Sequence, residues 1–495
     1  MESPFNRFNK QTTQIRKTIK PNHMKRSIIT KSDSYKATHP PQYPLGTEFV
    51  ESYLESRGGH FDNTVFFGLQ YIIKEHLMTP LTKADVDRAE FFWNAHFGVK
   101  GIFKRAMWDH IVDNLGGLLP VRICAVAEGT VVPVRNVMMT IRNTDKKCAS
   151  LTNFLETILL QVWFPTTVTT YSRECKKIIL KYLIDTGSPE LIKFKFHDFG
   201  YRGVSSDESA MIGGAAHLVN FNGTDTVAGI EMLMIYYNAE MCGFSIPASE
   251  HSTMTSWGKE NEGKAYENML DQYPTGLVAC VSDSWDIDNA VDKIWGQDLH
   301  DKVMKRDGTL VIRPDSGDPV SVTLRIVESL GKRFGFTTND KGYKVLDPHV
   351  RIIQGDGVNI ESIEAILSNF KAHGWSADNI AFGTGGKLLQ AHDRDEQQFA
   401  IKCCSITING VESDVYKQPK TDPNKNSKRG HLRLVRTSNG KIETRESGQN
   451  YTMEAVEDLL IPVFENGKLL VEYDLESIRN RAEIVVPEMS QASIN

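Results

Sequence analysis

The stretch KFHDFGYRGVSS at residues 195–206 decides the fold, because it reads as a short strand that ends in an aromatic ring, two glycines and an arginine. Five comparable stretches follow along the chain: GTDTVAGI (223–230), LVACVSDSWD (277–286), TLVIRPDSGDP (309–319), VRIIQGDGV (350–358) and NIAFGTGG (379–386). Segments of helical length and period separate them, such as 286–307, 320–334 and 360–373. This repeat of strand, polar turn and helix predicts a (β/α) barrel whose functional side chains gather at the carboxyl ends of the strands.

The sequence on either side of this repeat predicts a second domain. Between 47 and about 165, strand-like runs such as VMMTIRN mix with helical runs such as ADVDRAEFFWNAHFG, and strand signals return after 400 in FAIKCCSITIN and HLRLVRT. We therefore expect an α/β protein in which a barrel at 166–400 is inserted between 31–165 and 401–495, and these two pieces form one α+β sheet domain. Residues 1–30 form a basic arm, which we expect to be a disordered tail; a transit-type segment is the alternative.

Composition excludes several classes of protein. The chain of 495 residues, 40% hydrophobic and 24% charged, is long enough for two or three domains with large cores. Its formal net charge of −5 argues against a general nucleic-acid or membrane surface. The seven cysteines show no CxxC spacing, which favours a reducing compartment over a disulfide framework or a zinc site. We expect a cytoplasmic protein with no membrane span and no metal held by protein ligands.

Several strand ends carry residues suited to phosphate and ribose. FGTGG at 382–386 lets backbone N–H groups approach an anion at the start of a helix, late in the barrel where phosphate often binds. Asp315 and Asp356 can accept hydrogen bonds from ribose hydroxyls, and Arg313 can contact phosphate through two donors. The alternatives are an ordinary glycine-rich turn and aspartates that cap the following helices. The sequence contains no GxxxxGK[ST], which disfavours a P-loop nucleotidase.

Four further residues suit a flat amide-bearing substrate and a phosphoryl group. An ionised Asp225 can only accept hydrogen bonds, so it suits the N–H₂ of a ring amide; a cap or a turn is the alternative. Phe199 and Arg202 could hold a ring and an anion side by side, although a lone aromatic residue is more often part of a core. His251 lies among hydroxyls just before a helix pattern, which suits a phosphoryl group; packing is the alternative.

The strings HDFGYRGVSS, HLVNFNGTDTVAG, PASEHSTMTSWGK, VSDSWDI, IRPDSGDP, IIQGDGV, AFGTGG and DPNKNSKRG occur in this order. With them the chain closely resembles the nicotinamide phosphoribosyltransferases, a type II phosphoribosyltransferase family, from about Lys31 to about Arg481. The resemblance implies transfer of phosphoribosyl from phosphoribosyl pyrophosphate to nicotinamide, giving nicotinamide mononucleotide and pyrophosphate. It also implies a homodimer with active sites at the interface, ATP hydrolysis through a phosphorylated histidine, and magnesium held mainly by phosphates and water.

The same resemblance implies a role for each matching residue. Phe199 and, from the other subunit, Tyr35 would stack on the nicotinamide ring, and Asp225 would accept from its carboxamide. His251 matches the phosphorylated histidine, with Glu250 and Asp283 as orienting neighbours. Arg313 would stabilise the charge on the departing pyrophosphate. The remaining residues would hold phosphate (Arg202, Thr384, Gly385, Gly386 and, from the partner, Arg394 and Lys402), ribose (Gly355, Asp315, Asp356) and the pyrophosphate or nucleotide end (Arg57, Lys417, Lys425, Ser427).

One position departs from the family, and two other functions remain open. Ala279 stands where the family often has a serine that helps to hold the amide, so amide binding would rest on Asp225. A nicotinate phosphoribosyltransferase would have a related barrel, but the carboxylate of Asp225 would repel its acidic substrate. A non-catalytic interaction protein with the same fold is the second alternative, and the full set of phosphate and ribose residues argues against it.

Overall fold

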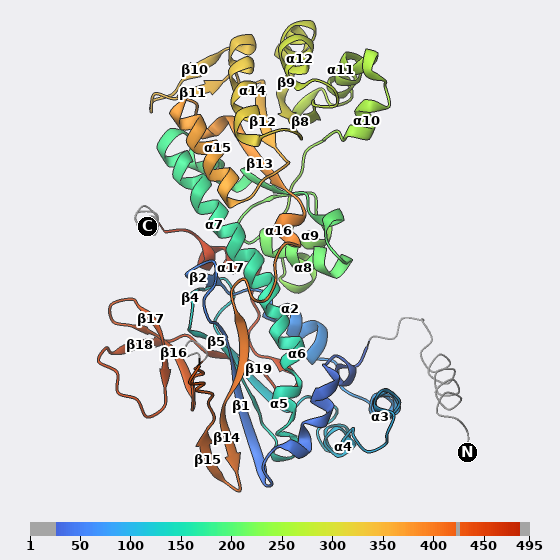
Figure 1. Cartoon of the computed structure of the whole chain (residues 1–495), viewed down its shortest axis with the longest axis vertical. Coiled ribbons are helices and arrows are strands. Elements are labelled where there is room, and N and C mark those ends of the chain that lie inside the picture. Colours follow the sequence, from blue (N-terminus) through green and yellow to red (C-terminus); the bar gives the residue numbers. More distant parts are fainter. Residues whose placement is uncertain (1–25, 422–425, 486–495) are drawn as a thin grey trace, which may run out of the picture. The chain divides into compact units, whose positions relative to one another are not determined.

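A computed structural model describes residues 26–421 and 426–485, which form two compact units (Figure 1). One unit, the sheet unit, contains the described residues up to Trp163 and those from Arg394 to Tyr473. The other, the barrel unit, contains residues from Phe164 to Asp393 and the described residues from Asp474 onward. Most of the predicted arm lies outside the described residues. Residues Ile28–Thr30, however, form the short helix η1 with Ile28 and Ile29 buried, so the expectation of a disordered tail is wrong for them.

The barrel unit contains six parallel strands in the order β7-β6-β13-β12-β9-β8. They are β6 (Phe196–Asp198), β7 (Gly223–Thr224), β8 (Thr275–Val281), β9 (Asp307–Arg313), β12 (Val350–Gln354) and β13 (Ile380–Thr384). Each of the six stretches singled out in the sequence overlaps one of these strands. The predicted barrel-like parallel sheet is therefore confirmed.

The segment at 244–249 joins the two edges of this sheet. Its residue Phe244 exchanges backbone hydrogen bonds with Asn222 and Thr224 beside β7, at 2.8 and 3.0 Å. Further along, the backbone N–H of Ala279 in β8 donates to Pro247 at 2.8 Å, and Ser249 donates to Ala279 at 3.0 Å. The segment thus takes the place of a strand between β7 and β8, which the sequence analysis did not predict.

Helices follow the strands of the barrel unit. The long helix α7 (Trp163–Thr186) is tied to α15 (Ile360–Ala372) by the hydroxyl of Tyr182, which donates to Glu364 at 2.7 Å, and α14 (Pro319–Phe334) packs on α15 (Figure 1). Further helices are α8 (Asp207–His217), α9 (Val227–Tyr236), α10 (His251–Thr255), α11 (Glu262–Gln272), α12 (Ile287–Asn289), η10 (Ala290–Asp298), α13 (His300–Met304) and α16 (Gly386–Leu389). A small hairpin, β10 (Phe336–Thr338) with β11 (Lys344–Leu346), follows α14.

The last helix, α17 (Leu475–Ala482), belongs to the barrel unit rather than to the segment 401–495 expected to form the sheet domain. The buried guanidinium of Arg173 on α7 donates to the carbonyl oxygen of Ala482 at 2.7 Å. Arg479 of α17 donates to the carbonyl oxygen of Leu218 at 2.8 Å. Charged donors on both sides therefore satisfy backbone acceptors between the helix and the barrel.

The sheet unit is built on seven antiparallel strands in the order β15-β14-β1-β5-β3-β19-β20. They are β1 (Thr47–Ser56), β3 (Val121–Ala125), β5 (Val137–Asn143), β14 (Phe399–Ile408), β15 (Val411–Asp414), β19 (Ile461–Glu465) and β20 (Lys468–Leu469). Smaller sheets pair β2 (Asn63–Val65) with β4 (Val131–Pro133), and β16 (Leu432–Thr437) with β17 (Ile442–Glu446) and β18 (Ala455–Asp458). Its main helices are α3 (Lys83–Phe97) and α4 (Arg105–Asn114). Early and late parts of the sequence meet in this sheet because β1 pairs with β14 and β3 with β19.

Within the described residues, no helix combines the length and the apolar character that a membrane crossing requires.

Candidate active site

Polar side chains gather at the carboxyl ends of the barrel strands, above an apolar interior. Ala279, Val311 and Ile353, from three neighbouring strands, form a buried cluster inside the barrel. Phe199 packs on this cluster and is itself only partly buried. One part of the Phe199 ring therefore belongs to the core, and another part remains exposed near the strand ends.

Phe199 is held in place by close backbone contacts. Its N–H donates to the carbonyl oxygen of Thr384 at 2.8 Å, which continues the pairing of β6 with β13. A Cβ atom on Gly383 would lie 1.9 Å from Cε2 of the Phe199 ring, so only glycine allows the ring to lie against β13. Phe199 thus combines the two roles weighed from the sequence: it packs on the core and leaves part of the ring accessible.

Asp225 lies directly after β7 and accepts hydrogen bonds from two side chains. Nε2 of His197 is 3.1 Å from its Oδ1, and the hydroxyl of Ser245 donates to the same oxygen. Burial opposes ionisation, but the contacts with His197 and Ser245 and the charge of Arg313 together outweigh it and hold the pKa of Asp225 below its usual value. Asp225 does not cap α9, whose N-cap residue is Thr226. The carboxylate is therefore ionised at neutral pH and 45% exposed.

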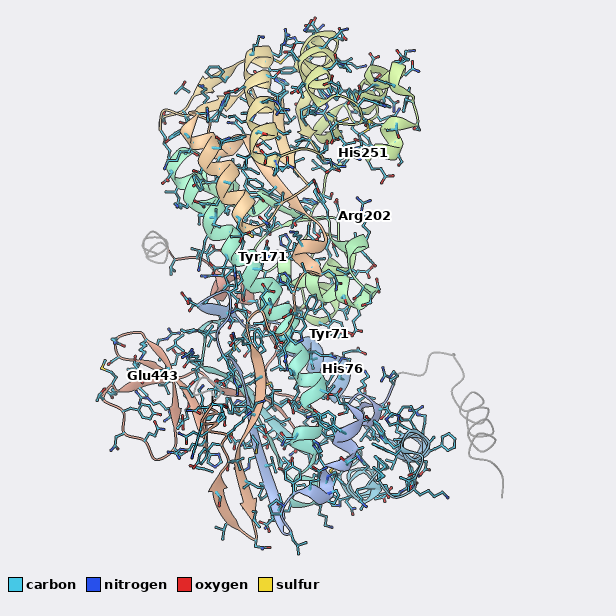
Figure 2. All side chains as sticks on the ribbon, viewed as in Figure 1. Tyr71, His76, Tyr171, Arg202, His251 and Glu443 are labelled. Atoms are coloured by element: carbon cyan, nitrogen blue, oxygen red, sulfur yellow. The ribbon has the colours of Figure 1, made fainter. Side chains whose placement is uncertain are left out.

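His251 begins α10 and faces two aspartates that follow neighbouring strands. Its Nε2 lies 3.0 Å from Oδ1 of Asp283, whose side chain is only 4% exposed. Its Nδ1 lies 3.8 Å from Oδ2 of Asp315. The other oxygen of Asp283 accepts from the backbone N–H of Asp315 at 3.1 Å and from the hydroxyl of Ser316 at 2.5 Å. The buried Asp283 therefore orients a histidine ring that is itself 45% exposed (Figure 2).

The helix-capping alternative is wrong for Asp315 and Asp356. The N-cap of α14 is Asp318, which accepts from the backbone N–H of Ser321 at 2.9 Å. The N-cap of α15 is Asn359, which forms a capping box with Ser362. Asp315 and the exposed Asp356 are thus not used to start these helices.

Arg313 ends β9 beside Asp315, with 3.6 Å between its guanidinium and that carboxylate. Its Nε–H is buried and has no hydrogen-bond partner among the described residues. A Cβ atom on Gly355 would lie 3.3 Å from Oδ1 of Asp315 and 3.7 Å from the Phe199 ring. Arg313, Asp315, Gly355 and Phe199 therefore border one another, with an unused donor in their midst.

The glycine-rich loop after β13 opens a short helix. Gly385 is the N-cap residue of α16, and Thr384 is buried with its hydroxyl donating to the carbonyl oxygen of Val358 at 3.3 Å. A Cβ atom on Gly203 would lie 3.0 Å from the Cα atom of Gly386, so the FGYRG turn and this loop touch. Arg202, in that turn, is 86% exposed and lies 4.0 Å from Glu250 (Figure 2).

The other predicted site residues belong to the sheet unit or lie outside the described residues. Lys402, on β14, has its pKa lowered by burial; Glu156 opposes this, and Arg57, Lys417 and Arg394 add to the lowering. Nη2 of Arg57 is buried without a partner among the described residues. Lys417 and Ser427 exchange backbone and hydroxyl hydrogen bonds at 2.8 and 3.0 Å. Tyr35 is 56% exposed on the short helix η2 (Ser34–Thr38), and Lys425 lies outside the described residues.

Two functional neighbours, His197 and Ser245, were missed from the sequence. His197 stands two residues before Phe199, so the period of a strand places both side chains on one face, and their rings lie 4.8 Å apart. The spacing of two residues from Phe199 could therefore have identified His197 from the sequence. Ser245 lies in the bridging segment 244–249, whose residues carry no strand signal.

Comparisons with known proteins identify the family. Residues 194–468 match the model of the Nicotinate phosphoribosyltransferase (NAPRTase) family, and residues 27–123 match the model of the nicotinamide phosphoribosyltransferase N-terminal domain. A nicotinamide phosphoribosyltransferase of Xanthomonas campestris pv. campestris is 49% identical over 467 residues, which cover 93% of this chain and 99% of the relative. One from Acinetobacter baylyi is 34% identical over 493 residues, covering 91% and 95%.

Solved structures share the fold at low sequence identity. A nicotinate-nucleotide pyrophosphorylase from Pyrococcus furiosus has a TM-score of 0.60 at 15% identity, covering 96% of this chain and 100% of that one. The human nicotinic acid phosphoribosyltransferase has a TM-score of 0.58 at 14% identity, covering 94% of each chain. The family model spans more than half of this chain, and the relatives match nearly all of it. The chain therefore belongs to the nicotinate phosphoribosyltransferase family of enzymes.

Proposed function

We propose that this enzyme transfers phosphoribosyl from phosphoribosyl pyrophosphate to nicotinamide, giving nicotinamide mononucleotide and pyrophosphate for the salvage of NAD. The relatives from Xanthomonas and Acinetobacter carry the name of this activity. The observation that carries the choice of nicotinamide is Asp225, an ionised and partly exposed carboxylate bonded to His197, whose ring in turn lies against Phe199. A carboxamide N–H₂ can donate to it, whereas the carboxylate of nicotinate would be repelled.

The base would lie against the exposed side of Phe199. A ring stacked there loses orientational freedom before reaction, and Asp225 fixes which edge of the ring carries the amide. Arg313 is close enough to lower the pKa of Asp225, so donors and acceptors alternate around the position of the amide. Ala279, inside the barrel below Phe199, offers no hydroxyl to the substrate.

Phosphoribosyl would be held at the strand ends. The backbone of Thr384, Gly385 and Gly386 at the start of α16, with Arg202, suits the 5′-phosphate, and Asp315 and Asp356 suit the ribose hydroxyls because neither caps a helix. The partner's Arg394 and Lys402 would add positive charge around the phosphate. Polar and basic side chains of the sheet unit would take the pyrophosphate or nucleotide end: Arg57, Lys417, Ser427 and, outside the described residues, Lys425. Arg57, Lys417 and Arg394 repel the charge on Lys402, and a bound anion would relieve this repulsion.

In the reaction, the bond between ribose C1 and the pyrophosphate oxygen breaks, and the pyridine nitrogen forms a new bond to C1. The nitrogen already carries a lone pair, so this chain needs no strong base. Oxocarbenium character develops on the sugar and negative charge on the leaving group, which Arg313 and the basic groups would stabilise. Magnesium would supply further charge neutralisation, held mainly by phosphates and water. This fits the described strand ends, where no three ligand side chains meet closely enough to hold an ion by themselves.

ATP would act as a second substrate through His251. Asp283 orients the ring by one nitrogen, which leaves the other nitrogen free to attack the γ-phosphorus of ATP and expel ADP. The phosphorylated ring would then stand beside Asp315 and Arg313, at the end of the site that handles pyrophosphate. A water molecule would later release phosphate from the histidine.

The enzyme would work as a cytoplasmic homodimer in which Tyr35 and the basic groups of the sheet unit come from the partner. Nicotinate is the alternative substrate, since the family model carries its name. A direct test incubates the purified protein with nicotinamide, phosphoribosyl pyrophosphate and magnesium and identifies the product by mass. Nicotinamide mononucleotide is expected; its absence would favour the non-catalytic alternative.

A further inference from the structure

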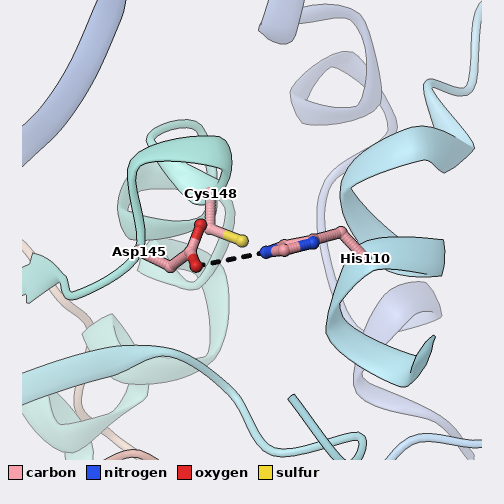
Figure 3. A group of neighbouring side chains, drawn as sticks. All are labelled: His110, Asp145 and Cys148. Carbon is pink, nitrogen blue, oxygen red and sulfur yellow. Dashed lines mark hydrogen bonds and ion pairs between the residues drawn. The ribbon is translucent and has the colours of Figure 1, made fainter. Parts of the chain in front are cut away.

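Three side chains that could bind a metal meet in the sheet unit: His110, Asp145 and Cys148 (Figure 3). One atom from each, an imidazole nitrogen, a carboxylate oxygen and the sulfur, lie within 4.8 Å of one another. Nε2 of His110 is 3.1 Å from Oδ2 of Asp145. None of the three belongs to the nicotinamide site, so their grouping needs its own explanation.

Local structure positions the three residues. Asp145 is the N-cap residue of the short 3₁₀ helix η5 (Lys146–Cys148), and the backbone N–H of Cys148 donates to its carbonyl at 3.0 Å. Residues three apart eclipse one another in a 3₁₀ turn, so Asp145 and Cys148 point to one side. His110 projects from α4, which is held against the same region by edge-to-face packing of Trp108 on Phe154, 5.1 Å between ring centroids.

A cysteine protease-like triad is the first reading of such a trio, and the geometry contradicts it. Cys148 has no exposed surface, so a substrate could not reach its sulfur. Burial also raises the pKa of its thiol to about 12, which leaves almost no nucleophilic thiolate at neutral pH. The trio is therefore not built for covalent catalysis.

We propose that His110, Asp145 and Cys148 form a binding site for a divalent cation of the zinc class, with water as the fourth ligand. Bonds of about 2.0–2.3 Å in a tetrahedral site place ligand atoms about 3.3–3.8 Å apart. The three atoms already lie within 4.8 Å of one another, and binding of the ion would draw them together to these distances.

The surroundings match those of a metal ligand set. Oδ1 of Asp145 is held by the backbone N–H of Lys147 at 2.8 Å, which leaves Oδ2 for the ion. Nδ1 of His110 faces the side-chain amide of Asn114 at 3.1 Å, and that amide can turn its oxygen to accept the N–H of a histidine bound through Nε2. The ion would displace the proton of the Cys148 thiol, which leaves for solvent. One carboxylate and one thiolate then neutralise a doubly charged ion, so the partly buried site carries no net charge.

Cobalt is the probe that tests the site, because thiolate-bound Co²⁺ gives a charge-transfer band in the near ultraviolet. The full-length protein, freed of metal with a chelator, is titrated with Co²⁺ and then with Zn²⁺. We expect one bound cobalt per chain with this band, and its loss when Zn²⁺ displaces cobalt. A wild-type protein that saturates without a charge-transfer band would overturn the proposal.

Variants assign the band to these residues. Cys148→Ser should abolish it, whereas Cys124→Ser, which removes a half-buried thiol on β3 in the same unit, should leave it unchanged. His110→Gln keeps the thiol and should weaken cobalt affinity at least about tenfold. Far-ultraviolet circular dichroism shows whether each variant folds; if Cys148→Ser does not, His110→Gln alone decides. A band that persists in Cys148→Ser, or an unchanged affinity in a folded His110→Gln, contradicts the site.

Discussion

Aspartates near the strand ends of the barrel differ, residue by residue, in what they bond. Asp318 accepts from a backbone N–H at the start of α14, which is a structural role. Asp225 accepts from the side chains of His197 and Ser245 and remains 45% exposed. The side chain of Asp283 is buried, and both of its oxygens contact neighbouring groups, the ring of His251 and the backbone N–H of Asp315. The side chains with unused capacity are the ones that face the proposed substrates.

Replacing Asp225 by Asn should weaken the use of nicotinamide and narrow its preference over nicotinate. The change removes the charge that attracts the amide and repels the acid. Losing a charged hydrogen-bond partner costs about 1.5–3 kcal/mol, or roughly ten- to hundredfold in kcat/KM for nicotinamide. Steady-state rates with both substrates measure it. Asp318→Asn is the matched control, because Asn caps a helix as well as Asp does; equal selectivity in all three proteins would sink the assignment.

Replacing His251 by Ala should abolish ATP hydrolysis and acid-labile phosphorylation of the protein. Slow synthesis of nicotinamide mononucleotide without ATP should remain, because the pyridine nitrogen attacks C1 without help from this ring. Labelling with γ-phosphate-tagged ATP and mapping the label checks both points. His373→Ala, which removes an exposed histidine on another helix end, serves as control. A label that persists in the His251 variant would move the phosphoryl acceptor elsewhere.

Which single residues the sequence could identify depended on their spacing from a recognisable strand. Phe199, Asp225, Arg313 and Asp315 follow apolar runs, so their place at the strand ends could be predicted. The sequence did not predict whether Asp315 and Asp356 cap the next helices. Each is followed three residues later by another capping residue, Asp318 or Asn359, which is the one that caps the helix.

At the scale of elements, β6 and the turn after it place Phe199 and Arg202. Asp198 ends β6 with its side chain fully buried, and it accepts from the backbone N–H of Gly200 at 2.7 Å. That bond holds the turn. The turn also needs glycine at position 200, because a Cβ atom there would lie 2.6 Å from Leu389 of α16. Burial raises the pKa of Asp198 to about 6.

This raised pKa predicts how Asp198 affects stability. Between pH 4 and 6 the folded protein retains a proton that the unfolded chain, with a pKa of 3.8, has lost. The free energy of unfolding therefore falls as pH rises, by about 3 kcal/mol in total for a difference of about two pH units. Asp198→Asn cannot titrate, so its stability relative to wild type should increase from pH 4 to pH 7. Thermal unfolding across this range measures the difference; one that is independent of pH would contradict the burial argument.

Elements were predictable where hydrophobic pattern and turn residues agreed. All six predicted barrel strands formed, and most of them are apolar runs that end in Gly, Asp or Arg. The segment 244–249 was missed: its sequence FSIPAS contains a proline and few β-branched residues, and it joins the sheet through only a few hydrogen bonds on each side. The trio of His110, Asp145 and Cys148 was also beyond reach, because α4 and η5 meet through tertiary packing.

At the scale of the whole molecule, the residues to which the proposal assigns roles are divided between the two units. Phe199 and Asp225 belong to the barrel unit, whereas Tyr35, Arg57 and Lys402 belong to the sheet unit. The sheet unit itself depends on both ends of the sequence, since β1 pairs with β14. The sequence predicted this insertion of one unit into the other from the return of strand signals after residue 400. It did not predict that α17 belongs to the barrel unit, because the sequence of a short amphipathic helix does not show which surface the helix packs on.

Mixing two inactive variants tests the proposed sharing of residues between subunits. Tyr35→Ala and Phe199→Ala should each lose activity as homodimers, because each site lacks one stacking ring. Heterodimers should recover up to about half of the wild-type activity per dimer, since one of their two sites carries both rings. Activity after demonstrated subunit exchange measures this. Mixtures as inactive as the parents would show that the two rings do not serve one site across subunits.

The selectivity for nicotinamide is the central claim, and a substrate panel tests it most directly. The purified enzyme receives nicotinamide or nicotinate, each with phosphoribosyl pyrophosphate and magnesium, and each with and without ATP. The account predicts nicotinamide mononucleotide in both nicotinamide reactions, faster with ATP, and at most traces of nicotinate mononucleotide. Equal or faster formation of nicotinate mononucleotide would contradict the role of Asp225 and with it the proposed function.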